Sequence, residues 1–243
     1  MRLFGQTLAI LAFSLMLFLG PNETRTKAQT QYCDLALVLA LDASSSVDTR
    51  EYALQMKGLA AALLNPEVKE AILSMGGLEM AAFEWNGKSN QKLIFNWTTL
   101  LTESDIINMA SKLAFHQRNS TNSPTAIGAA LGYGYRLLQK NPKRCTRNVI
   151  DVSGDGANNE GITPLDVYQF YDFGNIVVNG LVIKDLYENP ESFYRDAEIY
   201  YRQHVIRGPA AFLVLAHGFN DFEIAMKRKL LKEIVPGPIG RLN

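Results

Sequence analysis

The chain has 243 residues, a length that suits one α/β domain with a sizeable core. Its 24 basic and 24 acidic residues give a formal net charge of zero, so composition offers no electrostatic reason to expect a nucleic-acid partner. Cys33 and Cys145 are the two cysteines. They would pair as a disulfide in an oxidising compartment, whereas in the cytosol they would more readily be two buried thiols.

The first 30 residues have the pattern of an export signal and a short polar lead. Arg2 supplies a positive start, and Leu8–Leu19 is an almost unbroken apolar run of signal-peptide length. An uncleaved anchor is the alternative, although this run is too short to span a bilayer comfortably, and no later segment is long and apolar enough to do so. We therefore expect a periplasmic or secreted protein without a permanent membrane span. The expected divisions are a signal and lead over 1–30, one domain over 31–236 and a tail over 237–243.

The first structural unit is predicted to be a buried strand, a polar loop and a helix. Residues 35–41 form a continuous apolar run, as in a strand of a parallel sheet that helices cover on both faces. Asp48 followed by Glu51 resembles a capping box, in which each side chain satisfies a free amide at the start of a helix. The helical spacing of apolar residues then continues until Asn65-Pro66 ends it.

A hairpin and two helices are expected next. Residues 79–85 and 92–97 are short strand candidates on either side of Asn86-Gly87, a strong turn dipeptide, and this hairpin would place one antiparallel strand at an edge of the sheet. A helix is predicted over 102–114, and another is expected to open at Pro124-Thr125.

Three further strands follow, and a helix pattern succeeds each of them. The strands are predicted over 148–152, 176–183 and 211–216, and the helices over 164–173, 192–204 and 222–230. Alternating strands and helices with short connections are typical of a doubly wound, largely parallel sheet. The basic run Lys227–Lys229 is expected to be solvated in the last helix, near its negative end.

Five residues with oxygen-bearing side chains are predicted to meet at one edge of this sheet, because ligands bind beyond the carboxyl ends of strands where the strand order reverses. They are Asp42, Ser44 and Ser46 after the first strand, Thr125 at a helix start, and Asp155 after the strand 148–152. Two carboxylates and three hydroxyls suit a hard divalent cation, with Mg²⁺ preferred and Mn²⁺ or Ca²⁺ as alternatives. Gly154 and Gly156 are expected to adopt unusual backbone angles or to allow a close approach.

The pattern Asp42-x-Ser44-x-Ser46, followed by Thr125 and Asp155, resembles the metal-ion-dependent adhesion site of von Willebrand factor A domains. The resemblance covers nearly all of residues 33–235, with the elements in the right order. The runs 151–156 and 205–209 resemble more closely a bacterial family of secreted A-like domains of unknown function. One departure is that most adhesion sites have Thr-Asp-Gly around the second aspartate, whereas this chain has Gly-Asp-Gly, which can change the hydrogen bonding behind the ligands.

The resemblance implies both a fold and a function. The fold would be a doubly wound, mostly parallel sheet of six strands with one antiparallel edge strand and helices on both faces. The function would be that of an exported binding module, not an enzyme, which recognises a carboxylate of a protein partner through the bound cation. In the family fold the strands that carry the cysteines are adjacent and parallel, and Cys33 and Cys145 lie nine and ten residues before Asp42 and Asp155. A disulfide between them is therefore expected.

Two alternatives remain, and a third is excluded. In a structural or assembly domain the metal site would be closed or degenerate. An aspartyl-nucleophile phosphatase also begins with an apolar strand and an aspartate, but it needs a second acid two residues on, where this chain has Ser44. A serine hydrolase needs a Gly-x-Ser-x-Gly elbow, which the sequence lacks, and a histidine base.

The three histidines of the chain, His116, His204 and His217, have no metal-type spacing and are expected to be surface or loop residues.

Overall fold

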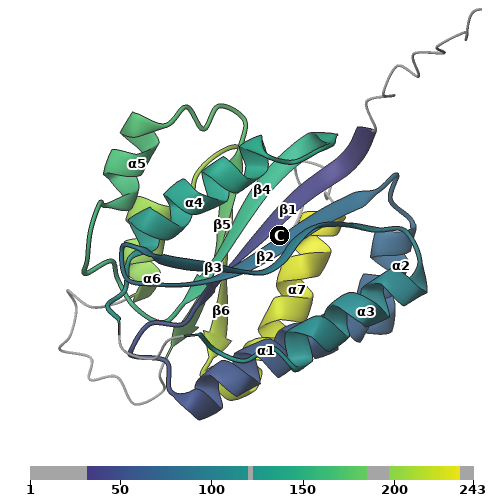
Figure 1. The fold of residues 1–243 in the computed structure, drawn as a ribbon, viewed down its shortest axis with the longest axis horizontal. Helices are drawn as coiled ribbons and strands as arrows, with labels where there is room; N and C mark the ends of the chain where they lie inside the picture. Colours follow the sequence, from purple (N-terminus) through teal and green to yellow (C-terminus); the bar gives the residue numbers. More distant parts are fainter. Residues whose placement is uncertain (1–31, 120–122, 185–196, 236–243) are drawn as a thin grey trace, which may run out of the picture.

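A six-stranded sheet forms the centre of the structure, a computed structural model that describes residues 32–119, 123–184 and 197–235 (Figure 1). The strands are β1 (Tyr32–Asp42), β2 (Leu78–Asn86), β3 (Asn90–Leu100), β4 (Arg144–Gly154), β5 (Val177–Lys184) and β6 (Leu213–His217). The helices are α1 (Thr49–Leu64), α2 (Pro66–Leu73), α3 (Glu103–Ala114), α4 (Ile127–Gln139), α5 (Pro164–Phe170), α6 (Ala197–Tyr200) and α7 (Phe222–Ile234), with a π-helical turn η2 (Tyr201–Val205) and a 3₁₀ turn η3 (Phe219–Asp221).

The strand order is β3-β2-β1-β4-β5-β6, and every neighbouring pair is parallel except β2 and β3. The predicted fold class is therefore confirmed, with β3 as the antiparallel edge strand. The chain runs from β1 through β2 to the edge strand β3, and later from β4 through β5 to the opposite edge strand β6. The strand order thus reverses between β1 and β4, and this switch point is where doubly wound sheets bind their ligands.

Helices cover both faces of the sheet, because β1 carries apolar side chains on both of its faces. Every residue from Leu35 to Leu41 is at most 1% exposed. The leucines at odd positions pack with α1, α3 and α7, whereas Ala36, Val38 and Ala40 pack with α4 on the opposite face (Figure 1). Because side chains alternate between the two faces of a strand, the same alternation places Asp42 on the α4 face at the end of β1.

Side-chain caps set the boundaries of the first two helices. Asp48 accepts a hydrogen bond from the amide of Glu51 at 2.7 Å, and Glu51 accepts one from the amide of Asp48 at 2.8 Å, so the predicted capping box is present. Asn65 ends α1 as predicted, but its side chain also accepts from the amide of Glu67 and opens α2, which the sequence did not predict. Pro66 takes the first position of α2, where a backbone amide would have no helical partner.

Several boundaries differ from the predicted ones. β4 begins at Arg144 rather than at residue 148, because it continues to pair with β1 as far back as Tyr32. α5 ends early at Phe170, whereas α7 continues to Ile234. Of the helix predicted over 192–204, the part before residue 197 lies outside the described residues. The remainder begins as α6 and widens into the π-helical turn η2.

A disulfide joins Cys33 to Cys145, as expected. The two residues lie directly opposite each other in the parallel pair of β1 and β4, with Cα atoms 4.4 Å apart. The bridge therefore holds the amino-terminal ends of the two strands whose carboxyl ends carry Asp42 and Asp155.

The expected export signal and the expected tail both lie outside the described part of the chain, so the predicted domain limits stay predictions. Within the three described ranges, each helix lacks the length or the apolar character that a bilayer-crossing segment needs.

Candidate metal site

The structure brings all five predicted donor residues together at the carboxyl edge of the sheet. The hydroxyl of Ser46 donates to Oδ1 of Asp155 at 2.8 Å, and the hydroxyls of Ser44 and Ser46 lie 3.1 Å apart. Thr125 donates to the hydroxyl of Ser44 at 3.4 Å. The loop after β1, the loop after β4 and the segment before α4 thus contribute to one continuous network of oxygen atoms.

Asp42 lies at the buried end of this network. Its Oδ1 accepts a hydrogen bond from the amide of Ser44 at 2.7 Å, but its Oδ2 is buried and has no hydrogen-bond partner within the described residues. Burial, and after it the negative charge of Asp155, raises the pKa of Asp42 to about 8, while the positive charge of Arg118 acts in the opposite direction. A buried carboxylate with a free oxygen beside a second carboxylate is a site that a cation would stabilise.

The donor set fits a hard divalent cation. Asp42 and Ser44 are fully buried and Thr125 is almost so, whereas Ser46 is exposed and Asp155 is half-buried, so the network reaches from the interior to solvent. Oxygen donors of this kind suit Mg²⁺, Mn²⁺ or Ca²⁺. Within the described ranges, no three or more histidine, cysteine, aspartate or glutamate side chains gather in a way that could hold a metal ion. The candidate site therefore depends on two carboxylates together with hydroxyls.

Arg118 holds the loop that follows β1. Its guanidinium donates to the carbonyl of Val47 at 2.7 Å, and to the carbonyls of Ala43 and Ser44 at 2.6 and 2.7 Å. Three carbonyls of a single tight loop are therefore bound by one planar cation, a geometry that lysine cannot reproduce. The sequence marks this arginine only as part of a polar loop, so its role was not predicted.

A buried glutamate in turn holds the segment that carries Arg118. Glu84 of β2 is 1% exposed; it accepts hydrogen bonds from the hydroxyl of Tyr52 at 2.6 Å and the amide of Asn119 at 2.9 Å. Nε2 of His116 lies 3.3 Å from the same carboxylate. Burial opposes ionisation of Glu84, but the contacts with His116, Tyr52 and Asn119 together lower its pKa. His116 is a half-buried loop residue, in line with the expectation, but the contact of its ring with a buried acid was not predicted.

Backbone contacts between loops set the position of Thr125. Its amide donates to the side chain of Asn159 at 2.8 Å, and its carbonyl accepts from the amide of Asn159 at 2.9 Å. On the other side, the carbonyl of Ser123 accepts from the amide of Ser45 at 2.9 Å, and the carbonyl of Pro124 accepts from Gly87 at 2.7 Å. The role of Asn159 was not predicted, since an asparagine in a polar loop after a strand is not distinctive by itself.

The two glycines around Asp155 do not have the unusual backbone angles that were expected of them. Neither Gly154 nor Gly156 has a positive φ. Gly154 instead allows a close approach, because a Cβ at this position would lie 2.8 Å from Oδ2 of Asp42. The close-approach alternative is therefore the correct one for Gly154.

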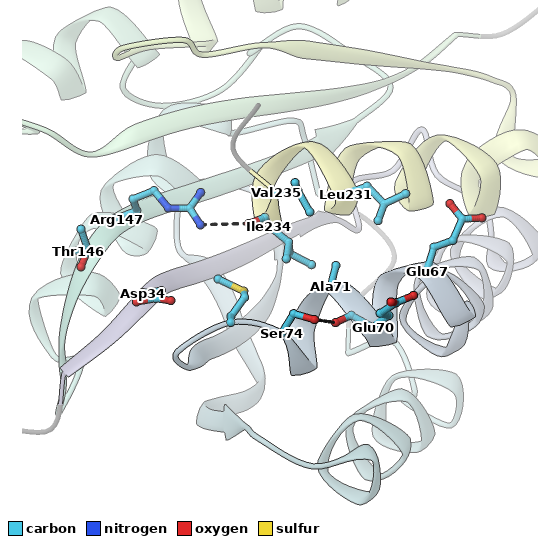
Figure 2. Close-up of a pocket in the computed structure, with 11 residues that line it drawn as sticks. Asp34, Glu67, Glu70, Ala71, Ser74, Thr146, Arg147, Leu231, Ile234 and Val235 are labelled. Atoms are coloured by element: carbon cyan, nitrogen blue, oxygen red, sulfur yellow. Dashed lines mark hydrogen bonds between the residues drawn. The ribbon is translucent and has the colours of Figure 1, made fainter. Parts of the chain in front are cut away.

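A cavity of about 590 Å³ lies at the opposite end of the sheet and shares no lining residue with the candidate site. Figure 2 shows the residues that line it. Asp34, near the start of β1, contributes to its lining, and roughly 26 Å of strand separates this residue from Asp42. Arg147 also lines the cavity and donates to the carbonyls of Glu233 and Ile234 at 2.6 and 3.3 Å. Its guanidinium thus satisfies carbonyls at the end of α7 (Figure 2).

Residues 32–238 match a family that is described as "Protein of unknown function (DUF1194)". The chain belongs to this family. No curated protein sequence matches it.

Several solved structures share the fold of this DUF1194 protein at low sequence identity. The pilus adhesin SpaC from Lactobacillus rhamnosus GG is 13% identical with a TM-score of 0.59, and the match covers 83% of this chain and 31% of SpaC. A von Willebrand factor type A protein from Catenulispora acidiphila is 14% identical, with a TM-score of 0.56 and coverage of 83% and 43%. Proximal thread matrix protein 1 from the mussel byssus, with a zinc-occupied MIDAS motif, is 14% identical, with a TM-score of 0.54 and coverage of 82% and 48%.

These similarities show that the DUF1194 protein has a von Willebrand factor A-like fold, as the sequence resemblance implied. The chain spans less than half the length of each of these three structures.

Proposed function

We propose that this DUF1194 protein is an exported binding module, which uses a divalent cation to recognise an acidic group of a protein partner. The observation that carries the proposal is the buried Oδ2 of Asp42, which has no hydrogen-bond partner among the described residues and belongs to a network that reaches solvent. A divalent cation would be held by Asp42, Ser44, Ser46, Thr125 and Asp155. Mg²⁺ fits this set of hard donors best, with Mn²⁺ or Ca²⁺ as alternatives.

The charge of the site is compatible with an acidic partner. Two carboxylates from the chain bring the net charge of a divalent cation to zero and not below it, so an added carboxylate can complete the coordination shell in place of water without net repulsion. The exposure of Ser46 and the partial exposure of Asp155 leave one side of the network open to a partner. Similarity to a pilus adhesin, and to a protein whose MIDAS motif holds zinc, supports a binding role and a metal-dependent site.

Export and the absence of enzyme activity are parts of the same proposal. Support for export comes from the Cys33–Cys145 disulfide, since such bridges persist in oxidising compartments, and from the signal-like pattern of residues 1–30. Support for binding rather than phosphatase chemistry comes from Ser44. This residue occupies the position where an aspartyl phosphatase needs an acid, and its hydroxyl is already in contact with Ser46 and Thr125.

Calorimetric titration with Mg²⁺ and with Mn²⁺ tests the metal site directly. Asp42→Ala removes a charged ligand, so we expect its affinity to fall by more than the roughly 10–100-fold that is typical of changes behind the first ligands. Asp48→Ala is the matched control, because Asp48 is a nearby carboxylate that caps α1 and makes no contact with the network. Equal affinities for wild type and Asp42→Ala would place the metal elsewhere or nowhere in this protein.

A pull-down from envelope extract, with metal and with chelator, tests the partner. We expect capture by wild-type protein with Mg²⁺, and loss of capture with chelator or with Asp42→Ala. Tight metal binding, together with partner capture that is equal with and without chelator, would instead favour a closed, structural metal site. Turnover of a phosphoester that depends on Asp42 would favour the phosphatase alternative.

A further inference from the structure

Tyr201 places a buried hydroxyl beside the candidate site. The side chain is fully buried, and its Oη has no hydrogen-bond partner within the described residues. A Cβ built on Gly154 would lie 2.7 Å from this Oη and 2.8 Å from Oδ2 of Asp42. The two buried oxygens, each without a partner, therefore face the same point above Gly154, and they can be no farther apart than the sum of these two distances.

Two glycines on neighbouring strands make room for this tyrosine. Gly154 ends β4 and leaves space for the hydroxyl, while a Cβ on Gly180 of β5 would lie 2.9 Å from Cδ1 of the Tyr201 ring. The ring thus lies over β5, and its hydroxyl points across β4 toward the end of β1. A side chain at Gly154 or at Gly180 would push the Tyr201 ring away from Asp42.

A local irregularity of the backbone brings Tyr201 to this position. Tyr201 begins the π-helical turn η2, and its carbonyl accepts from the amide of Ile206 at 2.9 Å. Single π-helical turns are uncommon and occur frequently at functional sites. The hydroxyl of Tyr168 in turn donates to the carbonyl of Val205, which holds the far end of the turn against α5.

We propose that Tyr201 is a positioning residue of the metal site, whose hydroxyl donates to Oδ2 of Asp42 through one water. The inference rests on the proposed function. A carboxylate oxygen has two lone pairs, so Oδ2 can accept this hydrogen bond and still face a cation.

The test is Tyr201→Phe, which removes the hydroxyl and keeps the ring. We expect Mg²⁺ and Mn²⁺ affinity to fall about 10–100-fold, the range typical of groups that orient metal ligands. The thermal stability of the metal-free protein should change little, because the hydroxyl that is removed makes no direct hydrogen bond with any described residue. A near-ultraviolet tyrosine difference signal on metal addition should be present in wild type and absent in Tyr201→Phe.

Tyr168→Phe is the matched control, because it removes the hydroxyl of a half-buried tyrosine that supports η2 from α5. We expect this variant to lose stability and to lose less metal affinity than Tyr201→Phe, because the Tyr201 hydroxyl itself is retained. Gly154→Ala should also weaken metal binding, because its Cβ would lie 2.7 Å from the Tyr201 hydroxyl and 2.8 Å from Oδ2 of Asp42 and would displace both.

Unchanged metal affinity in Tyr201→Phe, when Asp42→Ala abolishes binding, would overturn the role of Tyr201 and leave the proposed function intact. An affinity loss as large in Tyr168→Phe would also overturn it, since the effect would then be one of general packing. If wild-type protein binds neither metal, the proposed function fails, and the role of Tyr201 fails with it.

Discussion

Replacing Lys229 by methionine would leave two carboxylates in the protein interior without their counter-charge. Lys229 of α7 is fully buried, and its ammonium lies 2.9 Å from Asp151 of β4 and 2.6 Å from Glu233. Asn179 of β5 donates to Glu233 at 3.1 Å, so the cluster joins α7 to two central strands. Oδ2 of Asp151 and Oε2 of Glu233 have no hydrogen-bond partner within the described residues, which makes the ammonium their main compensation.

Removing one member of a buried ion pair costs about 3–5 kcal/mol, because the charge that remains stays buried and unpaired. Here one ammonium serves two carboxylates, so we expect Lys229→Met to lower the free energy of unfolding by about 4–5 kcal/mol. Whole domains are stable by only about 5–15 kcal/mol, so this loss would greatly lower the urea concentration at the unfolding midpoint. The dependence of the unfolding free energy on urea concentration should not change. The measurement belongs at about pH 8, above the pKa of about 7 for Asp151.

Lys227→Met on the same helix is the control for this experiment. Lys227 lies 2.7 Å from Glu67, but the two side chains are 29% and 66% exposed, and such surface pairs contribute at most about 1 kcal/mol. Equal losses in the two lysine variants would refute the argument from burial. A further check is Asp151→Asn in the Lys229→Met background, which removes one of the stranded charges and is expected to recover part of the stability.

Three further outcomes are expected. Burial raises the pKa of Asp151 to about 7, against the opposing effect of Lys229, so the folded state keeps a proton that the unfolded state releases near pH 4. Stability from this group therefore falls as the pH rises from about 4 to about 7, by at most about 1.4 kcal/mol per pH unit, and denaturation curves of Asp151→Asn should lack that slope. Arg118→Lys removes the guanidinium that binds three carbonyls of the loop after β1, and calorimetry should show roughly tenfold weaker Mg²⁺ binding. An unchanged affinity would mean that this loop keeps its conformation without the arginine. Replacing both Cys33 and Cys145 by serine opens a loop of 112 residues, and urea unfolding should show a loss of up to about 4–5 kcal/mol with little change in metal affinity; no loss would refute the entropic reasoning.

The sequence by itself determined the order of the elements and the edge at which the donor residues gather. These features depend on short-range signals: the apolar run of β1, the capping box at Asp48, the Asn86-Gly87 turn and the alternation of strands and helices. Once β1 and β4 are neighbours in a parallel sheet, the residues that follow them must meet at the same edge. The resemblance to von Willebrand factor A domains supplied that pairing, and with it the disulfide.

Only the tertiary structure decided which groups surround those donors. Arg118, Asn159 and Tyr201 come from segments far from Asp42 in sequence, and nothing in their local patterns sets them apart from ordinary loop or helix residues. Lys229 shows the same limit, because the expectation that the basic run 227–229 is solvated is wrong for this residue. Lysine is almost never fully buried unless it is paired, and its two acidic partners become visible only when α7 packs on the sheet. Periodicity reports which face of an element is buried, but the distance between side chains on different elements is set by how those elements pack.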